Sequence, residues 1–84
     1  MTRDEVIERI RAHLVTELEV QASAVGEDTR FREDLEADSL DLVELVVELE
    51  DRYGLRIPDD EAARLKTVGQ VADYVASHVP QEAR

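Results

Sequence analysis

The segment from residue 38 to 53 constrains the fold of this chain most, because it carries two apolar stripes at helical spacing. With successive residues about 100° apart around a helix axis, one set of apolar residues spans roughly 100°, the width of a face that packs on a core. That core-facing set is Leu42, Leu45, Val46, Leu49 and Tyr53. The opposite side carries a narrower stripe, formed by Leu40, Val43 and Val47. A helix on a small domain needs one buried face, so the second stripe is surplus.

Acidic side chains border this second stripe on both sides. They are Asp41, Glu44, Glu48 and Asp51 on one side and Glu50 on the other. An apolar strip rimmed by a single sign of charge indicates a docking surface for a basic partner with an apolar groove of its own. The alternative is a helix packed between two neighbours, which would place those acids near a buried seam, where unpaired charge is unfavourable.

Ser39 stands at the start of the predicted helix, with either Asp38 or Ser39 as the N-cap. Several backbone N–H groups are unpaired at such a position, and the helix dipole is positive there. A phosphate attached to Ser39 would be stabilised by those donors. Taken alone, however, a serine at a helix start is far more often a plain cap.

Three segments of the chain carry a family resemblance when they are taken together and in order. They are Phe-Arg-Glu-Asp-Leu-Glu-Ala-Asp-Ser-Leu-Asp (31–41) followed by Val-Glu-Leu-Val (43–46), Ile-Pro-Asp-Asp-Glu-Ala (57–62), and Lys-Thr-Val (66–68). Over essentially the whole chain they resemble acyl carrier proteins. The resemblance implies a 4'-phosphopantetheine arm on Ser39, which matches the family's serine. Glu36 departs from the family, since many members have glycine there; if that glycine serves a positive backbone torsion, the glutamate is mildly strained.

The resemblance also implies a function and a set of partners. The chain would carry growing acyl chains as thioesters, after modification by a phosphopantetheinyl transferase with coenzyme A, and would present them to fatty acid synthesis enzymes with basic docking patches. The residues expected to contact these partners are Asp38, Leu40, Asp41, Val43, Glu44, Val47, Glu48 and Asp51. A free-standing polyketide-type carrier is the closest alternative. The alternative of another class is an unmodified acidic interaction module in which Ser39 is only a cap.

Length and composition bound the other possibilities. The 84 residues suffice for one domain with one small core, which we expect to span residues 1–84. The chain has 21 acidic and 10 basic side chains and a net charge of −11. We therefore expect no binding to nucleic acid, because contact with its phosphates needs positive charge. It has no cysteine, no signal-like apolar run at its start, and no stretch near the ~18 apolar residues of a membrane span. We expect a cytoplasmic monomer.

Two further helices are predicted from apolar periodicity and capping boxes. The first covers about residues 3–18, with the capping-box spacing from Thr2 to Glu5 and apolar positions at Val6, Ile7, Ile10, Leu14 and Leu18. The last covers about 67–79, with the same spacing from Thr67 to Gln70, and Pro80 should close it. Its inward positions are Val71, Ala72, Val75 and Val79. The central helix, over about 39–53, should end at Gly54, and residues 59–64 can form only a short helix.

Residues 19–38 show no sustained periodicity and predict a long loop. Spaced apolar residues can pin such a loop across the helix ends, and they are Val20, Val25, Phe31 and Leu35. Phe31, the one phenylalanine, is expected to anchor the core. The predicted fold is therefore all-α: a small antiparallel bundle of three main helices plus one short helix, with a long first loop.

No arrangement of residues indicates catalysis by the chain itself. There is no cysteine nucleophile, no Ser-His-Asp order and no glycine-rich phosphate loop, and Ser39 has no histidine near it in the sequence to act as a base. The acids at 34, 36 and 38 imitate the start of an EF-hand loop, but Ser39 stands where glycine is needed and Leu45 where glutamate is needed. We expect no catalytic residue and no metal site, although weak divalent-ion binding to the acidic helix would relieve charge repulsion.

Overall fold

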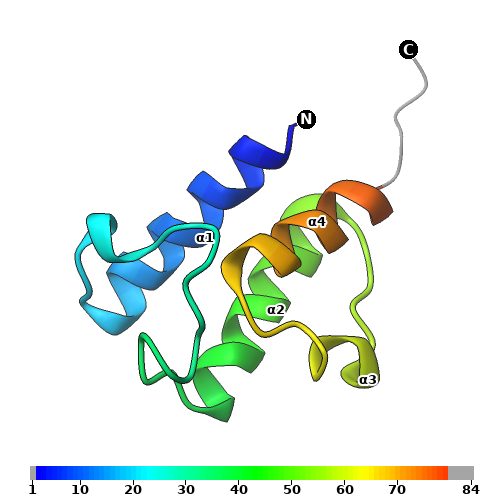
Figure 1. Ribbon diagram of the computed structural model, residues 1–84. Coiled ribbons are helices and arrows are strands. Elements are labelled where there is room, and N and C mark those ends of the chain that lie inside the picture. The colour runs from blue at the N-terminus through cyan, green and yellow to red at the C-terminus, as the bar shows by residue number, and fades with distance from the viewer. Residues whose placement is uncertain (1, 80–84) are drawn as a thin grey trace.

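Four α-helices build the part of the chain that the computed structural model describes, residues 2–79. They are α1 (Arg3–Leu18), α2 (Ser39–Tyr53), α3 (Asp59–Ala62) and α4 (Val68–His78), and a 3₁₀ turn, η1 (Ala22–Ala24), follows α1. In Figure 1, α1 runs in the opposite direction to α2 and α4, and the short α3 lies in the connection between α2 and α4. The predicted all-α bundle is confirmed. Pro80, which was expected to close the last helix, lies outside the described residues.

Local sequence explains where α1 begins and ends. The Thr2 hydroxyl accepts a hydrogen bond from the Glu5 N–H at 3.2 Å, and the Glu5 carboxylate accepts one from the Thr2 N–H at 2.9 Å. The predicted capping box is therefore present. At the other end, Glu19 adopts a left-handed backbone conformation, with φ of 57°, and ends the helix. The predicted apolar face is buried at Val6, Ile7, Ile10 and Leu14 and partly buried at Leu18.

The two helices after α2 are slightly shorter than predicted. α3 ends at Ala62 instead of residue 64, because the N–H groups of Arg64 and Leu65 bond to carbonyls three residues earlier, as in a 3₁₀ turn. α4 spans residues 68–78 instead of 67–79, because Thr67 is its N-cap and Val79 is already extended. The Thr67–Gln70 capping box is present. The buried side chains of α4 are Val68, Val71, Ala72 and Val75.

The long loop between α1 and α2 is pinned to the bundle by buried side chains and backbone hydrogen bonds. The predicted anchors Val25, Phe31 and Leu35 are buried, and Val20 is partly buried. An isolated antiparallel bridge joins residues 30 and 67, and the Phe31 N–H donates to the carbonyl of Lys66 at 3.2 Å. The loop is thus part of the core, and it fixes the position from which α2 starts.

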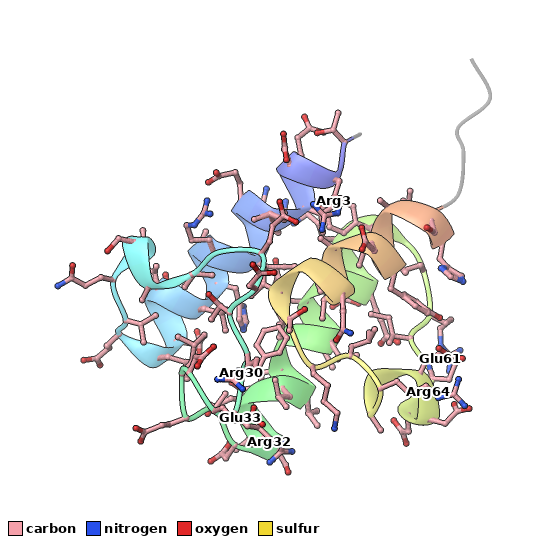
Figure 2. All side chains as sticks on the ribbon, viewed as in Figure 1. Arg3, Arg30, Arg32, Glu33, Glu61 and Arg64 are labelled. Carbon is pink, nitrogen blue, oxygen red and sulfur yellow. The ribbon has the colours of Figure 1, made fainter. Side chains whose placement is uncertain are left out.

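Arg3 connects the start of α1 to the loop and to α4. Its guanidinium lies 2.8 Å from the Glu27 carboxylate and also pairs with Asp73, and Figure 2 shows it between the two helices. Beside it, the Gly69 N–H donates to the Glu27 carbonyl at 2.8 Å, and a Cβ at Gly69 would lie only 2.9 Å from that oxygen. Glycine is therefore required for the close approach of loop and helix.

Candidate functional site

The two stripes of α2 differ sharply in exposure. In the core-facing stripe, Leu45 and Leu49 are 2% and 0% exposed, and the remaining members pack against the core while partly buried; these are Leu42, Val46 and Tyr53. On the opposite side, exposure is high for all three members of the second stripe: Leu40 64%, Val43 56% and Val47 48%. Within residues 2–79, α2 is therefore not packed between two neighbours, and that alternative is wrong. The second stripe is exposed, as predicted.

The acidic rim of this stripe is partly engaged within the chain. Glu44 and Asp51 are exposed and make no ion pair with other residues in the 2–79 range. Glu48 lies 3.5 Å from Arg52, one helical turn away, and the Glu50 carboxylate accepts a hydrogen bond from a backbone N–H of the following segment. Fewer acids of this rim are thus free to pair with a basic partner than the sequence indicated, because Glu48 and Glu50 already have partners within the chain.

Asp38 is the N-cap of α2, which decides between the two candidates that the sequence left open. Its carboxylate accepts from the Asp41 N–H at 3.0 Å, and the Asp41 carboxylate accepts from the Asp38 N–H at 3.0 Å. This reciprocal pair is a capping box with aspartate in place of the usual glutamate. The hydrogen bond from the Asp41 N–H is the main reason that the pKa of Asp38 is lowered.

Ser39 is the first residue of α2 and is exposed. Its hydroxyl oxygen accepts a hydrogen bond from Nη2 of Arg32 at 3.1 Å. The sequence did not predict this contact, since the two residues lie seven positions apart on either side of a turn. Of the helix N–H groups expected to stabilise a phosphate on Ser39, that of Asp41 is already bonded to the Asp38 carboxylate.

Glu36 forms the turn that brings Arg32 and Ser39 together. Its φ of 56° lies in the left-handed region, so the torsion that the family's glycine would serve is present here in a glutamate. Such a torsion costs a non-glycine residue about 1 kcal/mol. Two backbone hydrogen bonds hold the turn: the Glu36 N–H donates to the Arg32 carbonyl at 3.1 Å, and the Ala37 N–H donates to the Phe31 carbonyl at 2.9 Å.

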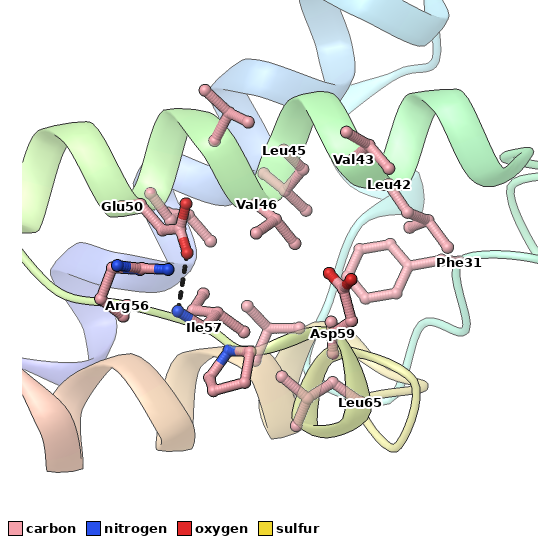
Figure 3. A pocket seen from close by; sticks show the side chains of 15 residues that line it. Phe31, Leu42, Val43, Leu45, Val46, Glu50, Arg56, Ile57, Asp59 and Leu65 are labelled. Atoms are coloured by element: carbon pink, nitrogen blue, oxygen red, sulfur yellow. Dashed lines mark hydrogen bonds between the residues drawn. The ribbon is translucent and has the colours of Figure 1, made fainter.

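A pocket of about 380 Å³ lies between α2 and the segment that follows it (Figure 3). At one side of it, the Glu50 carboxylate accepts from the Ile57 N–H at 2.7 Å and ties that segment to the helix. Leu42 and Val43 are three and four residues after Ser39, so the pocket begins one helical turn from the serine. The other apolar side chains of the lining include Phe31, Leu45, Val46, Leu49, Leu65 and Val71.

Comparison with known proteins identifies the family. The family of the phosphopantetheine attachment site matches residues 8–75 of the chain. An acyl carrier protein of Rubrobacter xylanophilus is 49% identical over 78 residues, 93% of this chain and 96% of that protein. The chain belongs to the acyl carrier protein family. One from Lactobacillus acidophilus is 44% identical over 78 residues, 93% of this chain and 98% of that protein.

The fold agrees with this assignment. The structure of the acyl carrier protein from Enterococcus faecalis resembles the chain with a TM-score of 0.79 at 36% identity, covering 92% of this chain and 98% of that one. As an acyl carrier protein, the chain has a carrier role based on phosphopantetheine and is not a catalyst. The start of α2 fits this group, because it offers an exposed hydroxyl beside a guanidinium that can meet a phosphate. No helix within residues 2–79 is long and apolar enough to cross a membrane.

Proposed function

We propose that Ser39 carries the 4'-phosphopantetheine arm and that the arm holds growing acyl chains as thioesters during fatty acid synthesis. The observation that supports this most is the exposed Ser39 hydroxyl at the first residue of α2, next to the guanidinium of Arg32. The other two serines, Ser23 and Ser77, lie in η1 and near the end of α4. Since the chain has no cysteine, the reactive sulfur must come from the arm.

The chemistry at Ser39 requires a partner enzyme. The hydroxyl oxygen would form a bond to the phosphorus that carries the pantetheine half of coenzyme A, while the bond from this phosphorus to the nucleotide half breaks and the hydroxyl proton leaves to a base. Arg32 cannot be that base, because a guanidinium stays protonated and only donates hydrogen bonds. We therefore assign the base to a phosphopantetheinyl transferase, and this chain acts as its substrate.

The exposed stripe of α2 is the surface that would dock on the transferase and on the synthesis enzymes. Its apolar members are Leu40, Val43 and Val47, and the acidic residues around it are Asp38, Asp41, Glu44, Glu48 and Asp51. A partner with a basic patch and an apolar groove would complement both features, and the net charge of −11 would speed their encounter. Attachment at Ser39 places the arm at one end of this surface.

The pocket beside α2 would shelter part of the acyl chain. Its lining is largely apolar, and it begins one helical turn from Ser39. An arm attached to Ser39 could fold back along α2 and place an apolar chain there, where contact with water is reduced. We further propose that the chain acts as a monomer in the cytoplasm, as a substrate of soluble enzymes.

Stepwise loading tests the proposed function. The phosphopantetheinylated chain is incubated with malonyl coenzyme A and the transacylase, condensing enzyme and reductases of a bacterial fatty acid synthesis system. We expect mass increments of a malonyl group and then of elongated acyl groups on the protein. Malonyl loading without elongation would favour the polyketide-type carrier instead. A phosphopantetheinylated chain that accepts no malonyl group would refute the role in fatty acid synthesis, whereas a chain that cannot be phosphopantetheinylated at all would favour the acidic interaction module.

A further inference from the structure

Arg32 forms no ion pair within residues 2–79, although its charge adds to the effect of the Asp41 N–H in lowering the pKa of the nearby Asp38. Its guanidinium donates to the Ser39 hydroxyl oxygen at 3.1 Å. Arg30, two residues earlier, is in contrast paired with Asp34 at 3.2 Å. Figure 2 shows Arg32 at the end of α2 where the helix begins. Arg32 thus places a cation 3.1 Å from the neutral hydroxyl of Ser39.

The backbone holds Arg32 in this position. The Arg32 carbonyl accepts a hydrogen bond from the Glu36 N–H at 3.1 Å. The backbone of the neighbouring Phe31 is held by two more, since its N–H donates to the Lys66 carbonyl and its carbonyl accepts from the Ala37 N–H. The Phe31 side chain is only 2% exposed. The guanidinium therefore extends from a fixed turn, so only side-chain freedom is lost when it binds a ligand.

Two N–H groups in the first turn of α2 are already engaged by Asp38. The Asp41 N–H is bonded to the Asp38 carboxylate at 3.0 Å, and the Leu42 N–H to the Asp38 carbonyl at 3.1 Å. The Asp38 carboxylate also places a negative charge next to the position that a phosphate would occupy. An anion attached to Ser39 would therefore be repelled by Asp38 unless a cation offsets that charge.

We propose that the Arg32 guanidinium binds the phosphodiester that joins the arm to Ser39; this rests on the proposed attachment at Ser39. A non-bridging oxygen of that phosphodiester is separated from the serine oxygen by the phosphorus alone, so the guanidinium can reach it with a small rotation. The contact changes from a hydrogen bond with a neutral hydroxyl to a charge-assisted one with a phosphate. Arg32 is a positioning residue, which offsets the charge of the phosphodiester and sets the direction in which the arm leaves the helix.

Two matched variants isolate the contact. Arg32→Gln retains a hydrogen-bond donor near Ser39 but removes the charge. Arg64→Gln makes the same change in net charge just after α3, where the side chain is 73% exposed and lies 3.8 Å from Glu61. Each variant and the wild type are prepared unmodified and phosphopantetheinylated, with intact mass as the check, and all six samples are melted at low and at high salt.

The difference in Tm between the modified and unmodified forms is the first readout. We expect this difference to be the same for wild type and Arg64→Gln. In Arg32→Gln, modification should lower the Tm by ~2–5 °C relative to its effect on wild type. High salt should remove most of this extra loss, because the contact is exposed and screened. Equal differences in all three proteins at low salt would overturn the proposal.

NMR of the wild type gives a readout that does not depend on modifying the variant. The Nε–H signal of Arg32 should shift on phosphopantetheinylation, while that of Arg64 should not. An unchanged Arg32 signal in a fully modified sample would overturn the Arg32 proposal and leave the attachment at Ser39 intact. If the wild type gains no phosphopantetheine at all, the attachment fails and the Arg32 proposal is refuted with it.

Discussion

Replacing Val47 and Leu49 by alanine, one at a time, separates the docking function of α2 from its packing function. The two residues are two positions apart on one helix, yet Val47 is 48% exposed and Leu49 is 0% exposed. At Leu49, the substitution leaves a cavity in the core and should reduce the free energy of unfolding by about 2–5 kcal/mol. For a domain of this size that corresponds to a fall in Tm of about 10–30 °C.

At Val47, two smaller effects nearly cancel. Removing two half-buried carbons loses about 0.8 kcal/mol of burial, whereas alanine gains about 0.5 kcal/mol of helix propensity over valine. The net change in the free energy of unfolding should stay within about 0.5 kcal/mol. Because Val47 lies in the proposed docking stripe, the same substitution should nevertheless lower kcat/KM of the phosphopantetheinyl transferase when the carrier is below saturation.

Thermal melts and transferase kinetics on the same preparations provide the assay. Glu44→Lys is a third comparison, because reversing an exposed rim charge should slow association and flatten its dependence on salt. If Val47→Ala melts as low as Leu49→Ala, and Glu44→Lys leaves the kinetics unchanged, both stripes of α2 are packing surfaces. The docking proposal would then have to be abandoned.

Three further predictions concern stability. Phe31→Ala should reduce the free energy of unfolding by about 3–5 kcal/mol, because the ring is 2% exposed and anchors the long loop; a wild-type Tm would refute this. The pKa of Asp34 is lowered by the Arg30 side chain, and that of Asp38 by the Asp41 N–H. The stability that these two carboxylates contribute is therefore fully present above the unfolded-state pKa of about 4 and is lost as the pH falls below it. Replacing both by asparagine should therefore flatten the fall of Tm with acid, and an equally steep fall would contradict it. With a net charge of −11, Tm should rise with added salt or millimolar-range divalent cations, and a Tm indifferent to ionic strength would indicate that the charges are already well paired.

The helices could be predicted from the sequence because their determinants are local. Apolar spacing sets the buried faces of α1, α2 and α4, and capping boxes at Thr2 and Thr67 set where two of these helices begin. The exposure of Val43 and Val47 likewise follows from their place on the helical wheel. These features need no knowledge of how the helices pack.

The details of the site could not be predicted in the same way, because they depend on tertiary placement. The Arg32–Ser39 contact requires the left-handed turn at Glu36, and the hydrogen bond from the Ile57 N–H to Glu50 requires the segment after α2 to fold back along the helix. Neither pair has a diagnostic sequence spacing. The choice of Asp38 as N-cap was also open, because aspartate and serine are both favoured there.

Intact-mass measurement tests the attachment of phosphopantetheine to Ser39. Wild type and Ser39→Ala are each incubated with coenzyme A, magnesium and a promiscuous phosphopantetheinyl transferase. Because Asp38 is the N-cap, Ser39→Ala keeps the cap, and its helical circular dichroism and Tm should remain close to those of wild type. We expect wild type to gain the mass of one phosphopantetheinyl group and Ser39→Ala to gain none. An unmodified wild type, or a modified Ser39→Ala, would contradict attachment at Ser39.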